Sequence, residues 1–197
     1  MKKTYDRSYY ERWYRGPNRI RSDGELQRKV VMAVSIAEFF LRRPIRSVLD
    51  VGCGEAPWFL QLRRLRPKVS YTGIESSDYA VDTFGRERNI RRGSVGDLRA
   101  LDTSRHYDLV VCADVLHYVS ERDARSGIRA MSRLSRGVVY LEVLTAEDEI
   151  IGDLHEFMRR PAQWYRDLCT RNGMTFVGPY TWLAPSMRPT MAELEGS

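Results

Sequence analysis

The sequence has no run of about eighteen apolar residues, so we expect no membrane-spanning helix and no membrane partner. Its basic first residues are not followed by an apolar segment, which argues against a secretion signal. The three cysteines, Cys53, Cys112 and Cys169, lie far apart, and no histidine stands at metal-ligand spacing from them. We therefore expect reduced thiols, no metal site and a cytoplasmic location.

Evenly spread positive charge is also missing, although the net charge is +6. Residues 1–46 carry twelve basic and five acidic side chains, whereas the remainder is close to neutral. A domain that binds a nucleic-acid backbone over a wide face usually carries its positive charge more broadly. Nucleic acid is therefore a less favoured partner than a small molecule, and the basic character belongs to the N-terminal segment.

Short apolar runs alternate with helical patterns along most of the chain. Ser22 and Glu25 have capping-box spacing and begin a helix that Pro44 stops. Buried strands are expected at 47–52, 69–75, 107–114 and 137–144, with a weak strand near 89–95 and two short strands within 174–184. Further helices are expected at 57–65, 77–88, 120–135 and 161–173.

This alternation predicts an α/β fold: a doubly wound, mostly parallel seven-stranded sheet with helices on both faces. The last two strands form a C-terminal antiparallel hairpin. We expect three parts: an aromatic and basic segment at 1–21, one domain at 22–184 and a flexible polar tail at 185–197. The oligomeric state does not follow from these patterns.

Polar residues and glycines follow the strands of the predicted sheet at their carboxyl ends, where doubly wound sheets bind ligands. Gly52 and Gly54 let the backbone approach a ligand closely, and Asp50 before them suits a positively charged group. Glu75 follows the second strand and can accept hydrogen bonds from a ribose diol. Asp97 follows the third and could accept one from the exocyclic amine of a base.

A glycine pair after a strand is weak evidence by itself, because enzymes that bind nicotinamide dinucleotides have such a pair as well. The nicotinamide motif has a third glycine, whereas Ala56 and Pro57 stand in that region here. An acid directly before the glycines would also repel a pyrophosphate. The turn therefore favours a ligand that carries an ammonium group over a dinucleotide.

Together, "VLDVGCGEAPW", "YTGIESS", "GSVGDL" and "YDLVVCADVLHYV" resemble the class I S-adenosylmethionine-dependent methyltransferases, in the order and spacing of that family and over roughly residues 25–184. The family often has a third glycine where Ala56 stands, a small departure. The resemblance implies S-adenosylmethionine as cofactor and S-adenosylhomocysteine as product. It also implies that Asp50, Gly52, Cys53 and Gly54 line the methionine part, Glu75 holds the ribose, Ser76 lies beside the adenine, Asp97 and Leu98 meet the adenine, and Cys112 and Ala113 offer carbonyls to the amino group.

Structural interpretations stand beside these roles. Gly52 and Gly54 could be plain turn glycines, and Asp97 could cap a turn or helix. His117 is the best candidate for a general base, because it follows the fourth strand, but it could equally pack at a helix start.

The acceptor site has several candidate residues. Tyr118 and Trp58 are candidate walls. His155, in the long link after the fifth strand, could line the acceptor site or pack in the core.

The reaction expected is in-line methyl transfer to an oxygen or nitrogen of a small molecule. The Asn/Asp-Pro-Pro-Tyr/Phe motif that the family uses for amino groups on bases is missing after the fourth strand, which argues against DNA adenine methylation. Two alternatives remain open. The chain could methylate RNA through its basic N-terminal segment, or it could bind S-adenosylmethionine without catalysis.

The stretch "DRSYYERWYR" at 6–15 is the most aromatic part of the chain. On an α-helix, Tyr5, Tyr9 and Trp13 would form one stripe, with Tyr10 and Tyr14 one position around. It could stack on single-stranded nucleic acid, dock as a plain helix or cover the cofactor as a lid; a membrane helix is disfavoured. The resemblance to the methyltransferases favours the lid and implies that Tyr10, Tyr14 or Arg19 holds the methionine carboxylate, while Tyr9 and Trp13 shield the pocket.

Overall fold

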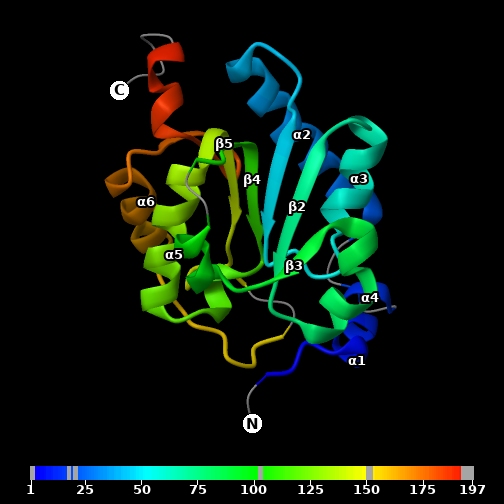
Figure 1. The fold of residues 1–197 in the computed structure, drawn as a ribbon. Coiled ribbons are helices and arrows are strands. Elements are labelled where there is room, and N and C mark those ends of the chain that lie inside the picture. Colours follow the sequence, from blue (N-terminus) through cyan, green and yellow to red (C-terminus); the bar gives the residue numbers. More distant parts are fainter. Residues whose placement is uncertain (1–2, 17–18, 20–21, 102–103, 150–152, 192–197) are drawn as a thin grey trace.

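The computed structural model describes residues 3–16, 19, 22–101, 104–149 and 153–191. Its centre is one sheet in the order β3-β2-β1-β4-β5-β7-β6 (Figure 1). The strands are β1 Ser47–Val51, β2 Ser70–Glu75, β3 Ile90–Arg92, β4 Tyr107–Ala113, β5 Ser135–Glu142, β6 Thr175–Gly178 and β7 Thr181–Leu183. The five neighbouring strands β3, β2, β1, β4 and β5 pair in parallel. Strand β7 is antiparallel to both β5 and β6. The predicted fold class is confirmed.

Helices cover both faces of the sheet, as the two groups on either side of the strands show (Figure 1). They are α2 Asp23–Leu41, α3 Pro57–Leu65 and α4 Asp78–Arg88 on one face, and α5 Glu121–Leu134 and α6 Ala162–Arg171 on the other. Each face has its own apolar core. Val30, Ala33 and Trp58 belong to the first core, and Ile128, Met131 and Leu168 to the second.

The parallel register aligns the strand ends that carry the predicted polar residues. Asp50 of β1 lies opposite Gly73 of β2 and Val111 of β4. Glu75 is the last residue of β2. The loops that follow β1, β2 and β4 therefore meet at one edge of the sheet, the edge that ligands use in folds of this kind.

The N-terminal segment lies across this same edge, at the bottom of the view in Figure 1. It begins as the α-helical turn α1, Arg7–Tyr10, and continues as the π-helical turn η1, Glu11–Arg15. The Gly16 N–H donates to the Glu11 carbonyl at 2.8 Å, an i→i+5 bond. Because the π-turn holds more residues per turn, Trp13 leaves the aromatic stripe expected for an α-helix and Tyr14 joins it.

Residues 185–190, expected to belong to a flexible tail, form the 3₁₀-helix η4, Pro185–Thr190. Met187 and Met191 pack against the first core. Residues 192–197 of the expected tail lie outside the described residues, as do 1–2, 17–18 and 20–21 of the expected N-terminal segment. No helix in the described part of the chain is long and apolar enough to cross a membrane.

Candidate active site

A cavity of about 360 Å³ lies between the carboxyl ends of the strands and the N-terminal segment. Its walls come from the loops after β1 to β5, from the first turns of α2 and α3, and from the N-terminal segment. Twelve of the residues predicted for the site line it: Tyr9, Tyr10, Tyr14, Asp50, Gly52, Cys53, Gly54, Trp58, Glu75, Ser76, Ala113 and Tyr118.

The turn after β1 requires glycine at position 52. Gly52 has φ +69°, and a Cβ there would lie 2.4 Å from the Val115 Cγ2 atom. Gly54 has φ +56°, and the Tyr10 ring lies over it, 3.2 Å from where a Cβ would stand. These glycines therefore form a turn that other residues would adopt only with strain, and they let a side chain of the N-terminal segment approach the backbone.

Asp50 points from the end of β1 into the cavity wall while remaining only 2% exposed. The Tyr71 hydroxyl donates a 2.7 Å hydrogen bond to its Oδ2 atom. Burial raises the pKa of Tyr71 well above its usual value, and the negative charge of Asp50 raises it further. The Tyr71 hydroxyl therefore keeps its proton. Asp50 is thus a positioned carboxylate at the floor of the cavity, suited to a cationic ligand group.

Glu75 connects the turn after β1 with the loop after β2. Its Oε2 accepts from the Gly54 N–H at 2.7 Å, and its Oε1 accepts from the N–H groups of Ser76 and Ser77 at 2.8 Å each. A carboxylate has about four acceptor positions. Among the described residues Oε2 accepts one hydrogen bond, from Gly54, so it can accept another, and Glu75 lines the cavity.

The loop after β3 contributes backbone rather than the expected side chains. Asp97 accepts from the N–H and hydroxyl of Ser94, at 2.8 and 2.7 Å, and so caps the 3₁₀-helix η2, Val95–Ala100. Leu98 is buried in the second core. Gly93, Ser94 and Val95 line the cavity, whereas Asp97 and Leu98 do not. The helix-cap interpretation of Asp97 describes its contacts in this structure.

His117 does not line the cavity either. It is 1% exposed in the short 3₁₀-helix η3, Leu116–Tyr118, and its Nδ1 accepts from the Leu144 N–H at 3.2 Å. Burial lowers the pKa of His117 to about 4, with smaller contributions from the charges of Lys3 and Arg160. The structure therefore places this ring as a neutral, packed side chain rather than at the cavity surface where a general base is needed.

Of the other candidates for the acceptor site, two line the cavity and one does not. Tyr118 lines the cavity, and burial raises its pKa to about 12. Trp58 also borders the cavity, but it is 2% exposed and packs on Tyr140 with ring centroids 4.8 Å apart. His155 is exposed and does not line the cavity, so neither alternative expected for it fits.

At the end of β4, Ala113 and Asp114 reach the cavity. Cys112 is fully buried in the second core and does not line it. Asp114 has φ +60°, an uncommon conformation for a residue other than glycine. Such backbone strain is concentrated at functional turns.

The N-terminal segment covers the cavity with tyrosines. Tyr9, Tyr10 and Tyr14 line it, and burial raises the pKa of both Tyr9 and Tyr10 far above the usual value. Trp13 lies outside the cavity, and the Arg12 guanidinium carbon lies 4.8 Å from the centroid of the Trp13 ring. Arg19 is exposed and does not line the cavity. The expected shielding by Trp13 and carboxylate contact by Arg19 therefore do not fit this arrangement.

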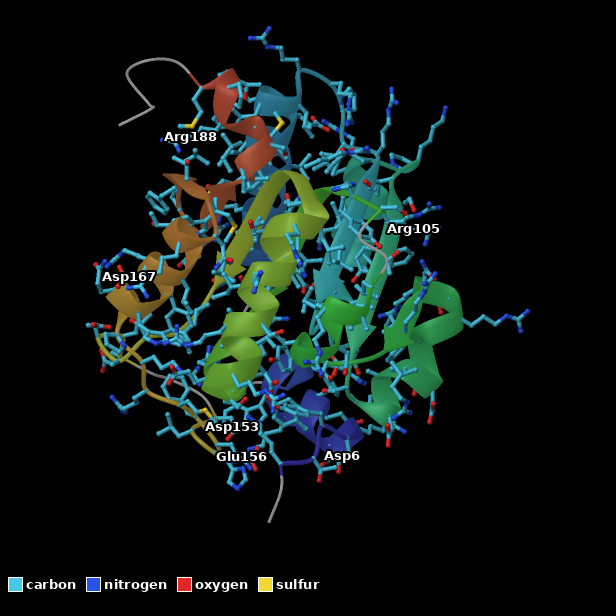
Figure 2. All side chains as sticks on the ribbon, turned by 60° about the vertical axis from the view of Figure 1, so that its left-hand side comes forward. Asp6, Arg105, Asp153, Glu156, Asp167 and Arg188 are labelled. Carbon is cyan, nitrogen blue, oxygen red and sulfur yellow. The ribbon has the colours of Figure 1, made fainter. Side chains whose placement is uncertain are left out.

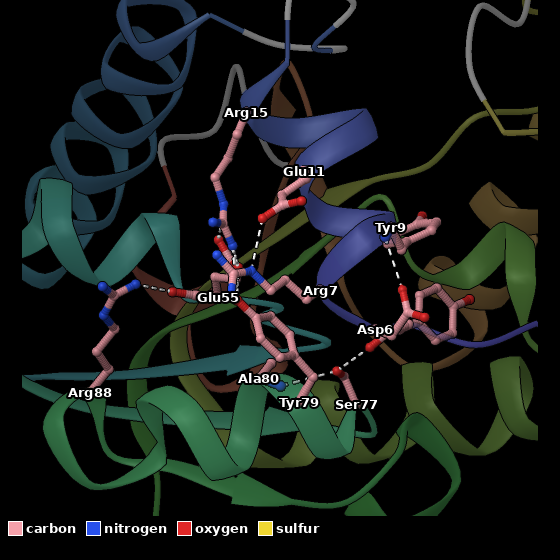
Figure 3. Close-up of polar contacts among 11 residues, drawn as sticks. Asp6, Arg7, Tyr9, Glu11, Arg15, Glu55, Ser77, Tyr79, Ala80 and Arg88 are labelled. Atoms are coloured by element: carbon pink, nitrogen blue, oxygen red, sulfur yellow. Dashed lines mark hydrogen bonds and ion pairs between the residues drawn. The ribbon is translucent and has the colours of Figure 1, made fainter.

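Arg15 joins one end of the segment to the turn after β1, as the close-up shows (Figure 3). Its guanidinium forms a two-point ion pair with the Glu55 carboxylate and donates to the Tyr79 hydroxyl at 2.9 Å. Tyr79 in turn donates to Glu55 at 3.2 Å, and Arg88 donates to the Glu55 carbonyl. This cluster fixes the segment over the cavity.

The other end of the segment contacts the loop before α6. The Lys3 Nζ lies 2.8 Å from the Asp153 carboxylate, and the Lys3 N–H donates to Glu156 at 3.1 Å. Figure 2 shows Asp153 and Glu156 at the same end of the molecule as Asp6 of the N-terminal segment. Two separate contacts thus hold the segment across the cavity like a closed lid.

Several lining residues were not predicted from the sequence, among them Lys3, Tyr5, Arg15, Ser22, Asp23, Leu26, Glu55, Ser94 and Glu156. The position of Glu55 directly after the second glycine was a signal that could have indicated one of them. Lys3 and Glu156 meet through long-range contacts that no local pattern reveals. Within the described residues, no three histidine, cysteine, aspartate or glutamate side chains are placed to hold a metal ion.

Comparisons with known proteins agree with this geometry. Residues 24–182 match the family model described as a methyltransferase domain. A ubiquinone biosynthesis O-methyltransferase of Nitrosospira multiformis is 33% identical over 98 residues, which is 46% of this chain and 39% of that protein. The methyltransferase ungE' of Aspergillus campestris is 28% identical over 102 residues, 47% of this chain and 29% of that protein. The matches therefore span well under half the length of these curated relatives.

Among solved structures, a magnesium protoporphyrin IX methyltransferase of Synechocystis PCC 6803 with bound S-adenosylhomocysteine has the same fold. Its TM-score is 0.61 at 15% identity, and the alignment covers 88% of each chain. The family match extends over the sheet, the helices on both faces and the glycine turn that the sequence motifs had indicated. The chain belongs to the methyltransferase domain family.

Proposed function

We propose that this protein binds S-adenosylmethionine and transfers its methyl group to an oxygen or nitrogen of a small-molecule acceptor. The observation that carries the proposal is the meeting of Asp50, the Gly52–Gly54 turn and Glu75 in one cavity. These are a carboxylate for a cationic group, a backbone that permits close approach, and a carboxylate for a diol. Their combination suits a nucleoside that carries an amino acid.

The cavity residues fit such a cofactor. The cavity volume of about 360 Å³ lies in the range usual for ligand pockets. The spare lone pair of Glu75 Oε2 can accept from a ribose hydroxyl. Asp50 and the carbonyl of Ala113 would hold the amino group of the methionine part, and Ser76 and Val95 would border the adenine.

When bound, S-adenosylmethionine supplies a sulfonium methyl group that is open to in-line displacement. The protein supplies position and a dry environment, and orientation alone is worth an effective molarity of roughly 10⁵ M or more. Tyr9, Tyr10 and Tyr14 cover the cavity and exclude water. With their raised pKa values, Tyr9 and Tyr10 stay neutral and bring no negative charge toward the reacting centre.

This chemistry does not need His117. A base is required only where the acceptor arrives protonated, and such a group must reach the acceptor directly or through one water. His117 is buried outside the cavity and bonded to backbone. We therefore assign catalysis to positioning and keep Tyr118 as an acceptor-side wall.

The small-molecule acceptor is favoured over RNA by the pairing of two basic residues of the N-terminal segment. Lys3 and Arg15 are paired with Asp153 and Glu55 of the same chain, so their charges are already compensated. The named relatives include an O-methyltransferase of ubiquinone biosynthesis.

The direct test is calorimetric titration with S-adenosylmethionine and S-adenosylhomocysteine, with NAD as the control ligand. We expect both sulfur nucleosides to bind and NAD not to. A screen of small hydroxy and amino compounds with labelled S-adenosylmethionine then tests transfer. Absence of binding by both nucleosides would overturn the proposal, whereas binding without transfer to any acceptor would favour the non-catalytic alternative.

A further inference from the structure

The ammonium group of Lys3 lies inside a cage of three tyrosine rings. Its Nζ is 3.5 Å from the ring centroid of Tyr118, 5.2 Å from that of Tyr5 and 5.3 Å from that of Tyr9. All three distances are within the roughly 6 Å at which a ring face attracts a cation. The Lys3 side chain is only 4% exposed, so the cage encloses it.

One carboxylate and one backbone carbonyl complete the cage. The Lys3 Nζ lies 2.8 Å from Asp153 Oδ2 and donates to the His155 carbonyl at 3.4 Å. The Tyr118 hydroxyl donates to the Asp153 carbonyl at 2.7 Å, which fixes the ring relative to this loop. Aromatic rings gathered around one nitrogen are an arrangement by which proteins recognise ammonium groups, and here one carboxylate adds an opposite charge.

The cage is part of the cavity wall. Lys3, Tyr5, Tyr9, Tyr118 and Glu156 all line the same cavity as the glycine turn. It is built from two parts of the chain, the N-terminal segment and the loops after β4 and β5. A ligand group in the cage would therefore lie in the cavity that also holds the proposed cofactor.

The remaining charges of the cavity are mostly negative. Six acidic side chains line it, against the two basic ones Lys3 and Arg15: Asp23, Asp50, Glu55, Glu75, Asp114 and Glu156. Arg15 is already paired with Glu55. S-adenosylmethionine brings a net charge of +1, which leaves an excess of carboxylates for a second ligand.

We propose that the Tyr5–Tyr9–Tyr118 cage is the acceptor subsite for a cationic amine, and that Lys3 fills it when no acceptor is bound. This inference rests on the proposed function, because it names the acceptor class for that reaction. The acceptor carries an alkylammonium or quaternary ammonium group, which the cage holds as a recognition handle.

The ligand in the cage must be a cation, because displacing Lys3 leaves the Asp153 carboxylate without its ion-pair partner. Asp153 is 16% exposed at its side chain, and an uncompensated carboxylate in that position is unfavourable. A neutral or anionic acceptor would displace Lys3 without replacing its charge. Lys3 lies before α1, outside the helices and strands, so it can leave without unfolding an element.

The test uses choline and its neutral isostere 3,3-dimethylbutan-1-ol as probes. Both are titrated calorimetrically into the full chain and into Lys3→Gln, with and without S-adenosylhomocysteine. We expect choline to bind Lys3→Gln about tenfold more tightly than the parent chain, since the competing ammonium group is gone. The neutral alcohol should bind neither protein measurably.

Two double variants locate the binding. Lys3→Gln with Tyr118→Leu removes the nearest ring and should lose the gain in choline affinity. Lys3→Gln with Trp13→Leu should keep it, because Trp13 lies on the same segment but outside the cavity. Thermal unfolding of each variant separates a lost site from a lost fold.

Equal choline affinity in the parent chain and Lys3→Gln, or equal binding of the neutral alcohol, would overturn the cage proposal. The same result would leave the proposed function standing wherever S-adenosylhomocysteine binds. Conversely, choline binding in a chain that fails to bind S-adenosylhomocysteine would keep the cage as a cation-binding site, while overturning the proposed function and with it the acceptor role of the cage. The two failures are therefore distinguishable.

Discussion

The backbone N–H of Gly54 donates a 2.7 Å hydrogen bond to the Glu75 carboxylate, linking the turn after β1 to the end of β2. The same carboxylate holds the first residues of the next loop through Ser76 and Ser77. Glu75 is therefore a structural anchor for both loops of the proposed cofactor site. Its effect on binding and its effect on stability are coupled.

Replacing Glu75 by Gln should weaken S-adenosylhomocysteine binding at least tenfold and lower the melting temperature. The amide keeps one acceptor oxygen, but its NH₂ group would face either the Gly54 N–H or the loop N–H groups. Hydrogen bonds to a charged group are worth about 1.5–3 kcal/mol each, so a tenfold loss is a lower bound. Glu87→Gln, on the exposed side of α4, is the matched control. Unchanged affinity in Glu75→Gln would contradict the assignment.

Gly52→Ala should destabilise the fold by about 3 kcal/mol. The residue has φ +69°, and the new Cβ would lie 2.4 Å from Val115 Cγ2, so both backbone strain and a clash oppose it. Urea unfolding measures the loss. Gly24→Ala in the first turn of α2 is the control, because the nearest atom to its Cβ is 3.7 Å away. Equal stability of the two variants would show that the turn relaxes freely.

Arg15→Gln should release the N-terminal segment at one end and speed dissociation of S-adenosylhomocysteine. Arg15 is 41% exposed at its side chain, so solvent weakens the pair with Glu55 to about 1 kcal/mol, roughly a fivefold rate change. Stopped-flow displacement measures the rate. Arg12→Gln, on the same segment but turned toward Trp13, should leave it unchanged. If both variants behave like the parent chain, the segment does not act as a lid.

The sequence predicted the sheet and its helices because the elements that form them are locally consistent. Helix α3 begins at Pro57 and ends at Leu65, as expected, since proline suits the first turn and an apolar run follows it. The strand ends that carry Asp50 and Glu75 were located correctly because buried parallel strands are short and strongly apolar. Their position at the cavity follows from the fold class alone.

Side-chain direction within a loop could not be predicted in the same way. Asp97 follows a strand end, but Ser94, three residues earlier, offers it a local capping partner. His117 also follows a strand end, yet its ring packs inward against Phe157, with centroids 5.1 Å apart. Trp13 was misplaced because the prediction assumed an α-helical period, whereas tertiary contacts such as Arg15 with Glu55 accompany a π-turn.

His117 should make the stability of the protein depend on pH between about 4 and 6.5. Burial lowers its pKa to about 4 in the folded chain, with Lys3 and Arg160 as the nearby charges, against 6.5 when exposed. Above pH 6.5 the ring is neutral in both states, so its full contribution is present. As the pH falls toward 4, the unfolded chain binds a proton that the folded chain does not, and the free energy of unfolding decreases.

Between pH 7 and 5 this decrease amounts to about 2 kcal/mol for the one ring, measured by urea unfolding at each pH. In His117→Asn, whose side-chain oxygen can still accept from the Leu144 N–H, that part of the decrease should vanish. His106→Asn, at an exposed histidine, should retain it. The same His117→Asn protein should keep its methyl-transfer rate within a few-fold, because the ring lies outside the cavity. A rate loss of about 100-fold or more would instead identify His117 as the general base.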